Sequence, residues 1–223
     1  MDTSMRTLAL TLALCTGCGG SGADPIPLED YAEAFAASSC AQIYECCDAT
    51  ERTTVFGSAD PAPTDEAACR AYYLGLIGST TDTLRAAVDE GVAEYDPQAA
   101  GDCFAQSAAT SCSQATNPSA APEACSRAVR GLLADGEPCS SPFACAGSRC
   151  AMIEGTWVCA SAPGPGEACT SSCTTGHYCD TASDGTCRPQ LANGEACSSD
   201  LACLGLECGD DGVCTESTFC DGA

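Results

Sequence analysis

The sequence Gly136-Glu137-Pro138-Cys139 returns as Gly166-Glu167-Ala168-Cys169 and again as Gly194-Glu195-Ala196-Cys197. The three copies begin 30 and then 28 residues apart, a period that indicates tandem repetition of one small unit. Each copy opens a set of four cysteines: Cys139, Cys145, Cys150 and Cys159; Cys169, Cys173, Cys179 and Cys187; and Cys197, Cys203, Cys208 and Cys214. We therefore predict three tandem four-cysteine modules, at 135–160, 165–188 and 193–214, in a region 135–223 that ends in a C-terminal tail.

Between its third and fourth cysteine, every module carries an acidic residue followed by glycine. These pairs are Glu154-Gly155, Asp184-Gly185 and Asp211-Gly212. Glycine accepts the positive φ of a tight turn, so each module should contain a short β-hairpin. The four cysteines of a module lie within about 20 residues, so each module should close on itself. Of the three connectivities that four cysteines allow, we choose first-to-third with second-to-fourth, although the spacing leaves the other two open.

The chain has 22 cysteines among 223 residues, whereas cytosolic proteins keep few because the cytosol holds thiols reduced. This density predicts an oxidising compartment and disulfide bonds. Aromatic residues make up 5% of the chain, and the apolar residues are mostly Ala and Cys, so a large core of Leu, Ile and Phe is not expected. Disulfides should therefore supply part of the stability.

The chain is strongly acidic, with 31 Asp and Glu against eight Arg and no Lys, a formal net charge of −23. The acidic residues are spread along the chain, which is typical of the solvated surface of an exported protein. This charge repels phosphate, so we predict no nucleic-acid partner and no binding to anionic lipid. The absence of Lys also excludes a Lys nucleophile.

The N-terminus combines Arg6, a short apolar run at 7–14 and the sequence Cys15-Thr16-Gly17-Cys18. The run has about eight residues, far fewer than the roughly 20 that cross a bilayer as a helix, so it indicates a signal peptide. The segment resembles a bacterial lipoprotein signal, in which a cysteine after small residues is acylated and becomes the mature N-terminus. The resemblance implies a signal peptide at 1–17, lipidation of Cys18 and a flexible tether at 18–24. Cys15 is the alternative, although Leu14 before it is bulky for a cleavage site.

Residues 25–133 have a different texture, with apolar residues at three- and four-residue steps. This pattern predicts helices at 28–47, at 64–78, at 84–95, from Asp96-Pro97 towards Cys112, and at 122–132. Tyr31, Tyr72 and Tyr73 could line a ligand groove, but aromatic residues at helical spacing more often belong to a core. The predicted fold is an α-helical, disulfide-stapled N-terminal domain followed by small disulfide-rich modules with short β-hairpins.

The helical domain contains seven cysteines: Cys40, Cys46, Cys47, Cys69, Cys103, Cys112 and Cys125. Seven is odd, so at most six can pair within the domain, and an unpaired thiol is reactive in an oxidising compartment. The modules use 12 cysteines and leave Cys220 in the tail. We predict that Cys220 pairs with a cysteine of the helical domain and so fixes the modules against the helices. The alternative is a free or intermolecular thiol.

The G-E-x-C opening and the four-cysteine spacing resemble the Dickkopf N-terminal cysteine-rich region and the related EB-type extracellular modules. The whole layout resembles the cysteine-rich lipoproteins of some high-GC Gram-negative bacteria. The resemblance covers residues 135–214; it implies a small disulfide fold used for extracellular binding and brings no catalytic residue. The second module departs from the pattern, with three rather than five residues between its first two cysteines.

The sequence lacks the residue patterns of common catalytic and metal sites. A hydrolytic triad needs an imidazole, and the one histidine, His177, has no nucleophile motif beside it. No C-x-x-C pair of a zinc site follows Cys18. Asp180 with Asp184, or Asp210 with Asp211, could offer oxygen ligands to calcium, but neither pair has the ligand count of an EF-hand loop. We therefore predict no enzyme activity, no cofactor and no metal site.

These features favour a non-catalytic, lipid-anchored outer-membrane protein, facing the periplasm or the cell surface. Its contact with the membrane would be the N-terminal lipid, and its modules would bind an unknown protein or glycan. Gly19 after the lipidated cysteine indicates the outer membrane, because lipoproteins with Asp at that position are retained at the inner one. The alternative is a protease-inhibitor-like secreted disulfide protein that presents Pro142-Phe143 or Ile153-Glu154 in a rigid loop.

Overall fold

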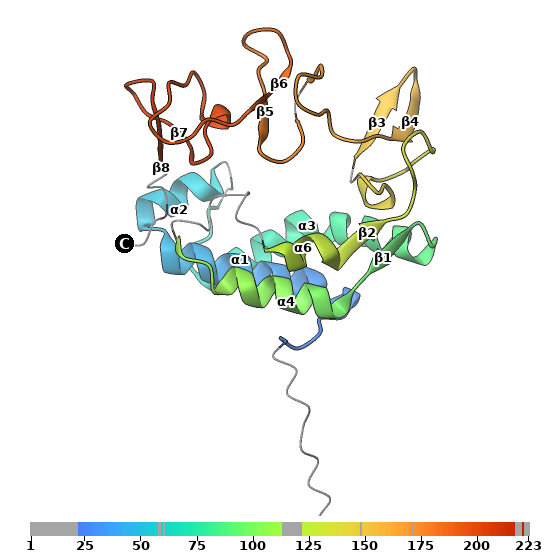
Figure 1. Cartoon of the computed structure of the whole chain (residues 1–223). Helices are drawn as coiled ribbons and strands as arrows, with labels where there is room; N and C mark the ends of the chain where they lie inside the picture. Colours follow the sequence, from blue (N-terminus) through green and yellow to red (C-terminus); the bar gives the residue numbers. More distant parts are fainter. Residues whose placement is uncertain are drawn as a thin grey trace, which may run out of the picture.

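The computed structural model of the protein describes residues 22–57, 59, 61–112, 122–147, 149–170, 172–216 and 220. Figure 1 shows helices gathered on one side and small β-hairpins in a row on the other. The helices come from the N-terminal part of the chain and the hairpins from the C-terminal part, which confirms the predicted fold class in its main features. None of the helices in the described ranges is long and apolar enough to span a bilayer. The predicted signal peptide, with Cys15 and Cys18, lies outside the described residues.

The helical part contains a 3-10 turn, five helices and two short strands within the described ranges. In chain order these are η1 (Leu28–Asp30), α1 (Tyr31–Cys46), α2 (Ala49–Phe56), α3 (Glu66–Asp89), β1 (Ala93–Tyr95), α4 (Pro97–Ala108), α6 (Glu123–Ala128) and β2 (Val129–Gly131). Asp96 caps α4, as the sequence predicted, and Asp65 caps α3, which begins at Glu66 rather than at 64. Sequence analysis missed α2, which begins with a capping box between Asp48 and Glu51.

Three of the predicted helix boundaries are wrong. The helix that was expected to end at Gly78 continues to Asp89, because a glycine weakens a helix without ending it when other contacts hold the turns. Tyr95, expected in a helix, lies in β1. The last predicted helix ends at Ala128, and Val129 begins β2, which runs antiparallel to β1. The β-branched Val129 favours this extended strand.

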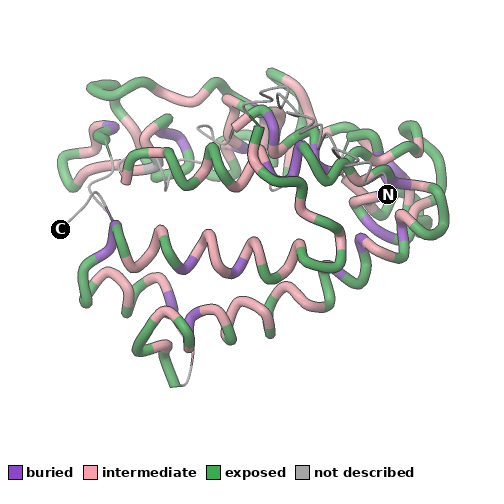
Figure 2. Tube along the Cα trace, turned by 90° about the horizontal axis from the view of Figure 1, so that it is seen from below, coloured by how far each residue is buried: buried purple, intermediate pink, exposed green. Residues whose placement is uncertain are grey.

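The core of the helical part consists mostly of Ala and Cys. Figure 2 shows buried positions as short, separated stretches of the chain rather than long runs. Cys40–Cys69 joins α1 to α3, and Cys103–Cys125 joins α4 to α6. Small side chains let these helices approach closely but bury little apolar area, so the disulfides stabilise packing that the core alone would hold weakly.

A row of aromatic rings, half-buried except for the buried Phe56, runs from β1 across α4, α1 and α3 to α2. Neighbouring ring centroids are 5.5–6.5 Å apart in the order Tyr95, Tyr31, Phe104, Phe35, Tyr73, Tyr72 and Phe56. Most of these contacts are edge-to-face, which aromatic quadrupoles prefer. The three tyrosines considered for a ligand groove thus take part in helix packing. At the end of the row, Tyr95 Oη donates to the Ile26 carbonyl at 2.8 Å, and burial raises the pKa of Tyr95 to about 12.

The start of the described chain is bound to α4. The amide of Ala23 donates to Asp102 Oδ1 at 3.0 Å, and Gln98 Nε2 donates to the Ala23 carbonyl at 2.8 Å. Gly101 faces the Asp24 carbonyl so closely that a Cβ would collide with it. Ordered structure therefore begins before Pro25, within the segment that we expected to be part of a flexible tether.

The first module follows β2 without a flexible linker. The amides of Leu132 and Leu133 donate to the Ala144 carbonyl at 2.9 and 2.8 Å, and the Ala146 amide returns a bond to the Leu133 carbonyl at 2.9 Å. Gly131 lies against the backbone of Cys145, where any Cβ would collide with the Cys145 carbonyl. These hydrogen bonds therefore join the helical part directly to the first module.

We predict that Gly131→Ala destabilises the protein by more than about 2 kcal/mol, because the new Cβ meets backbone that cannot move without breaking the junction. Gly78→Ala is the matched control. Its Cβ meets no atom within 4 Å, so this change should stabilise α3 by up to about 1 kcal/mol. Chemical denaturation of the oxidised protein measures both; equal effects would contradict the close approach at Gly131.

Candidate binding face in the three disulfide modules

Each module contains one antiparallel two-stranded hairpin. The first pairs β3 (Cys150–Ile153) with β4 (Thr156–Cys159), the second β5 (His177–Cys179) with β6 (Cys187–Pro189), and the third β7 (Leu206–Cys208) with β8 (Cys214–Glu216). A 3-10 turn precedes the hairpin in the first and third modules, η3 (Pro142–Ala144) and η4 (Asp200–Ala202). The acidic residue and glycine of each module lie between the two strands, as predicted.

The predicted connectivity is confirmed in all three modules, because the first cysteine pairs with the third and the second with the fourth. The bonds are Cys139–Cys150 and Cys145–Cys159, Cys169–Cys179 and Cys173–Cys187, and Cys197–Cys208 and Cys203–Cys214. In each module the sulfur atoms of the first three cysteines lie within 4.8 Å of one another. The two bonds are thus packed together and form the centre of the module. Bonded sulfurs are not thiolates, so these clusters are not metal sites.

The G-E-x-C motif forms the same turn in each module. Its glycine has a φ of 77–89°, in the left-handed region that favours glycine. A carboxylate oxygen of its glutamate accepts from the amide three residues earlier, at Ala134, Gly164 and Ala192. The glutamate carbonyl accepts from the amide of the fourth cysteine at 2.8–2.9 Å. The motif that reveals the repeat is therefore a folding element, and its glutamate is engaged within the module.

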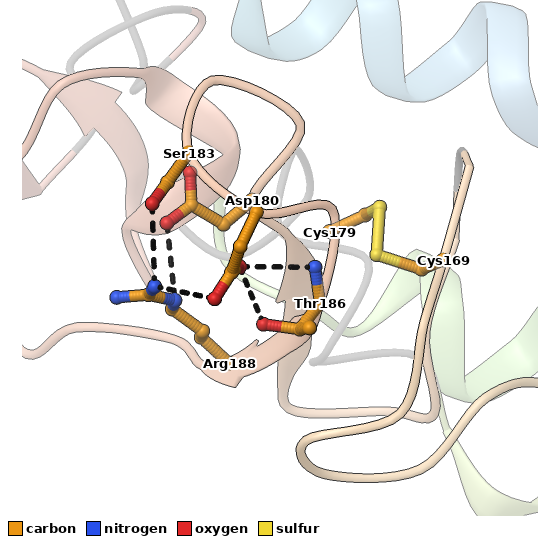
Figure 3. A network of polar contacts seen from close by, with 7 residues as sticks. Cys169, Cys179, Asp180, Ser183, Thr186 and Arg188 are labelled. Atoms are coloured by element: carbon orange, nitrogen blue, oxygen red, sulfur yellow. Dashed lines mark hydrogen bonds and ion pairs between the residues drawn. A yellow bond between two sulfur atoms is a disulfide. The ribbon is translucent and has the colours of Figure 1, made fainter.

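Arg188 occupies the acidic loop that we considered for calcium. Its Nε lies 3.1 Å from Asp180 Oδ2, and its Nη2 lies 3.3 Å from Asp184 Oδ2. Figure 3 shows the guanidinium among these carboxylates and the hydroxyl of Ser183. The two carboxylates thus already have a cation between them. In the third module, Asp211 Oδ1 instead accepts from the Val213 amide at 3.2 Å, so this carboxylate stabilises the turn that contains it.

Hydrogen bonds from Thr186 lower the pKa of Asp184, and the charge of Arg188 lowers it further. We predict that Thr186→Val, which keeps the side-chain shape but removes the hydroxyl donor, raises this pKa towards the ordinary value of an Asp. Because the folded pKa is depressed, the contribution of Asp184 to stability is present above the ordinary Asp value and is lost as the pH falls through the folded pKa. Carboxyl chemical shifts measured through an acid titration check this, with Ser183→Ala as the control that should leave the Thr186 bonds intact.

Cys220 is bonded to Cys47, which confirms that the tail joins the helical part. The Cys220 amide donates to Glu51 Oε1 at 2.8 Å, while Glu51 Oε2 accepts from the Asp48 amide at 2.8 Å. One carboxylate thus caps α2 and binds the tail. The adjacent Cys46, the last residue of α1, pairs with Cys112. Cys47 follows the helix with an extended backbone, so the two neighbouring cysteines reach different partners. The row of modules is therefore attached to the helices at both ends.

We predict that the double variant Cys47→Ser with Cys220→Ser folds but loses about 2–4 kcal/mol of stability, because one crosslink is removed from the unfolded chain and no free thiol is left to form wrong pairs. Thermal unfolding and amide hydrogen exchange of the third module measure the loss. The control is Cys40→Ser with Cys69→Ser, which removes a crosslink inside the helical part. If hydrogen exchange in the third module responds equally to both double variants, the tail does not hold that module in place.

The first hairpin has three exposed apolar side chains. Met152 is 59% exposed, Ile153 50% and Trp157, the single tryptophan, 52%. The two-residue turn Glu154-Gly155 has positive φ at both residues, 50° and 83°, as a tight hairpin turn requires. Of the two candidate inhibitory loops, Ile153-Glu154 joins the end of β3 to the turn, and Pro142-Phe143 lies in η3.

Two other features, the single histidine and an open cleft, offer less to a ligand than the hairpin does. His177 Nδ1 lies 3.2 Å from the Thr175 carbonyl in its own loop. An open cleft of about 500 Å³ beside α4 and α6 is lined by Tyr95, Arg127 and an ion-paired Arg130 and Glu94, among others. Opposite charges largely cancel there, so the cleft selects no charged ligand.

Comparison with known proteins returns no match: no family model, no curated protein and no solved structure corresponds to this chain. Sequence analysis located the cysteines of the site but missed the exposed face of the first hairpin. The apolar run Ala151-Met152-Ile153 and the pair Trp157-Val158, on either side of Glu154-Gly155, could have indicated a strand pair with apolar side chains on both faces. The Glu154-Gly155 turn gives the register that places Met152 beside Trp157.

Proposed function

We propose that the protein is a non-catalytic, lipid-anchored envelope protein that displays its disulfide modules away from the membrane as a binding face for a polypeptide. The observation that carries the proposal is the position of residues 22–27, at which the described part of the chain begins. Figure 1 shows the segment before η1 on the side of the helical layer opposite to the row of hairpins. An anchor attached just before this segment would hold the helices near the bilayer and point the modules outward.

The length of the tether supports the same orientation. From Cys18 to Ala23, which is bound to α4, five residues span at most about 17 Å when fully extended. A body held this closely cannot turn over freely. The modules cannot collapse onto the helices or drift from them either, because the Gly131 junction and the Cys47–Cys220 bond hold both ends of the row.

The state of the cysteines supports a binding role rather than thiol catalysis. Within the described ranges, the cysteines are disulfide-bonded, and His177 Nδ1 lies against the Thr175 carbonyl of its own loop. The net charge of −23 keeps such a surface soluble and favours basic partners over acidic ones. The localisation that fits these properties is the outer membrane, on its periplasmic or outer face.

We predict that intact-mass analysis of the membrane fraction shows a triacylated chain that begins at Cys18, because a single acyl chain holds a protein only marginally. Cys18→Ser should release the protein into the soluble fraction, whereas Cys15→Ser should leave it anchored. A soluble chain that begins at Ala23 or later would refute the anchor.

Orientation is tested separately, with the acylated protein in phosphatidylcholine vesicles that carry brominated lipid. We expect the fluorescence of Trp157 to remain unquenched, because the modules point away from the bilayer. Quenching equal to that of a tryptophan introduced at Gln98, beside the chain start, would contradict the proposed display.

A further inference from the structure

We propose that β3 of the first module is a strand-addition site for an extended polypeptide segment that has apolar side chains at alternate positions and a net positive charge. This inference rests on the proposed function and names the part of the binding face that makes contact. Three independent observations lead to it: the free edge of β3, the exposed side chains beside that edge, and the charge of the chain.

The backbone amide and carbonyl of Met152 point away from β4, the partner strand in its own hairpin. Ile153 and Thr156 flank the two-residue turn and face each other as a hydrogen-bonded pair, so the next pair, Met152 and Trp157, directs its amides and carbonyls outward. On the β4 side this direction is confirmed, because the Trp157 carbonyl accepts from the Cys139 amide at 3.1 Å. On the β3 side, no backbone hydrogen bond outside the hairpin involves Met152 within the described ranges.

The third module shows how such an edge is closed. There Asp200 Oδ1 accepts from the Cys208 amide, the outward amide of the third cysteine, at 2.8 Å. The corresponding sequences are Ser140-Ser141-Pro142 and Ser198-Ser199-Asp200, so Pro142 stands where Asp200 stands. Proline offers no carboxylate to the amide of Cys150. The first module therefore lacks the carboxylate that covers the amide of the third cysteine in the third module. Cys150 begins β3, two residues before Met152, so this substitution leaves the start of the β3 edge without that cap, and an uncovered edge is a template for another strand.

The side chains next to this edge are apolar and exposed. Met152 and Trp157 are direct partners across the hairpin and so share one face. With Ile153, each keeps at least half of its surface in solvent. A strand added to β3 would place one of its own side chains beside Met152 on this face and the next beside Ile153 on the other. Backbone bonds would supply affinity, and alternate apolar side chains would supply specificity.

Charge selects the kind of segment. The chain carries a net charge of −23, and Glu154 lies in the turn at the end of β3, so a basic segment is attracted and an acidic one repelled. A second copy of the chain would bring two surfaces of −23 together, which opposes self-pairing. The bilayer that holds the proposed anchor lies on the opposite side of the helical layer.

The test uses the oxidised full-length ectodomain and the acetylated, amidated peptide Lys-Val-Lys-Val-Lys-Val-Lys as the probe. Because Trp157 is the single tryptophan and the peptide has none, fluorescence reports directly on the hairpin. We expect a saturable blue shift and slower hydrogen exchange at the Met152 amide. The same peptide with N-methylated valines cannot form strand bonds and should fail, as should the peptide with Glu in place of Lys.

Met152→Glu should weaken binding of the Lys-Val peptide at least about tenfold, since it puts charge into the centre of the contact. Leu201→Glu is the matched control. Leu201 is equally apolar and 64% exposed, but it lies in η4 of the third module, so its change should leave binding unaltered. Mass analysis of the disulfides verifies that both variants are folded.

Four outcomes would overturn the inference. They are no saturable shift, equal binding of the N-methylated peptide, a Trp157 shift that follows self-association of the protein alone in sedimentation, and a shift caused by phosphatidylcholine vesicles alone. Each is separable from the proposed function, because acylation at Cys18 and the orientation of the modules are measured without the peptide. If the protein is anchored with its modules facing outward but does not bind the peptide, only the strand-addition site is refuted.

Discussion

Pairs of disulfides packed against each other replace a hydrophobic core in the C-terminal part of this protein. In each module, the first-to-third and second-to-fourth bonds bring three sulfur atoms within 4.8 Å, and the short strands on either side bury little else. Fewer than 30 residues cannot bury enough apolar surface to offset the entropy of ordering the chain, so crosslinks must reduce the entropy of the unfolded state. Once these bonds hold the centre, the loops around it are free to vary.

The helical part also buries little apolar surface, because Ala and Cys fill most of its buried positions. Close contacts between backbone segments take the place of large side chains. Gly101 lets the backbone of Asp24 lie against α4, and Gly131 lets the backbone of Cys145 lie against β2. At the far end, Glu51 caps α2 and binds the amide of Cys220, so the tail bond is supported by a second contact. Attachment at both ends makes the row of modules one body with the helical layer.

Three copies of one framework allow a comparison inside a single molecule. The turn glycine, the capping glutamate and both disulfides are repeated, and they explain why the G-E-x-C motif persists. The residues that differ lie at the hairpins. Arg188 neutralises two carboxylates in the second module, Asp200 covers a strand edge in the third, and the first exposes Met152 and Trp157 instead. Variation on a common scaffold is how small disulfide folds acquire separate surfaces, and the first hairpin combines an open edge with exposed apolar side chains.

The sequence by itself predicted disulfide bonding, the three modules, their hairpin turns and a bond from Cys220 to the helical part, because cysteine spacing and parity do not depend on how the chain packs. It also indicated most helices from their apolar period, but it placed an end at Gly78 and a helix at Tyr95. The first error arises because a glycine weakens a helix without ending it. The second arises because β1 pairs with β2, a contact between residues 93 and 131 that no local pattern encodes. Only the tertiary structure decided that Cys47 is the partner of Cys220, that Arg188 lies between Asp180 and Asp184, and that the β3 edge is open. Each depends on which distant backbone segments meet, and chain entropy and packing, rather than local propensity, decide that.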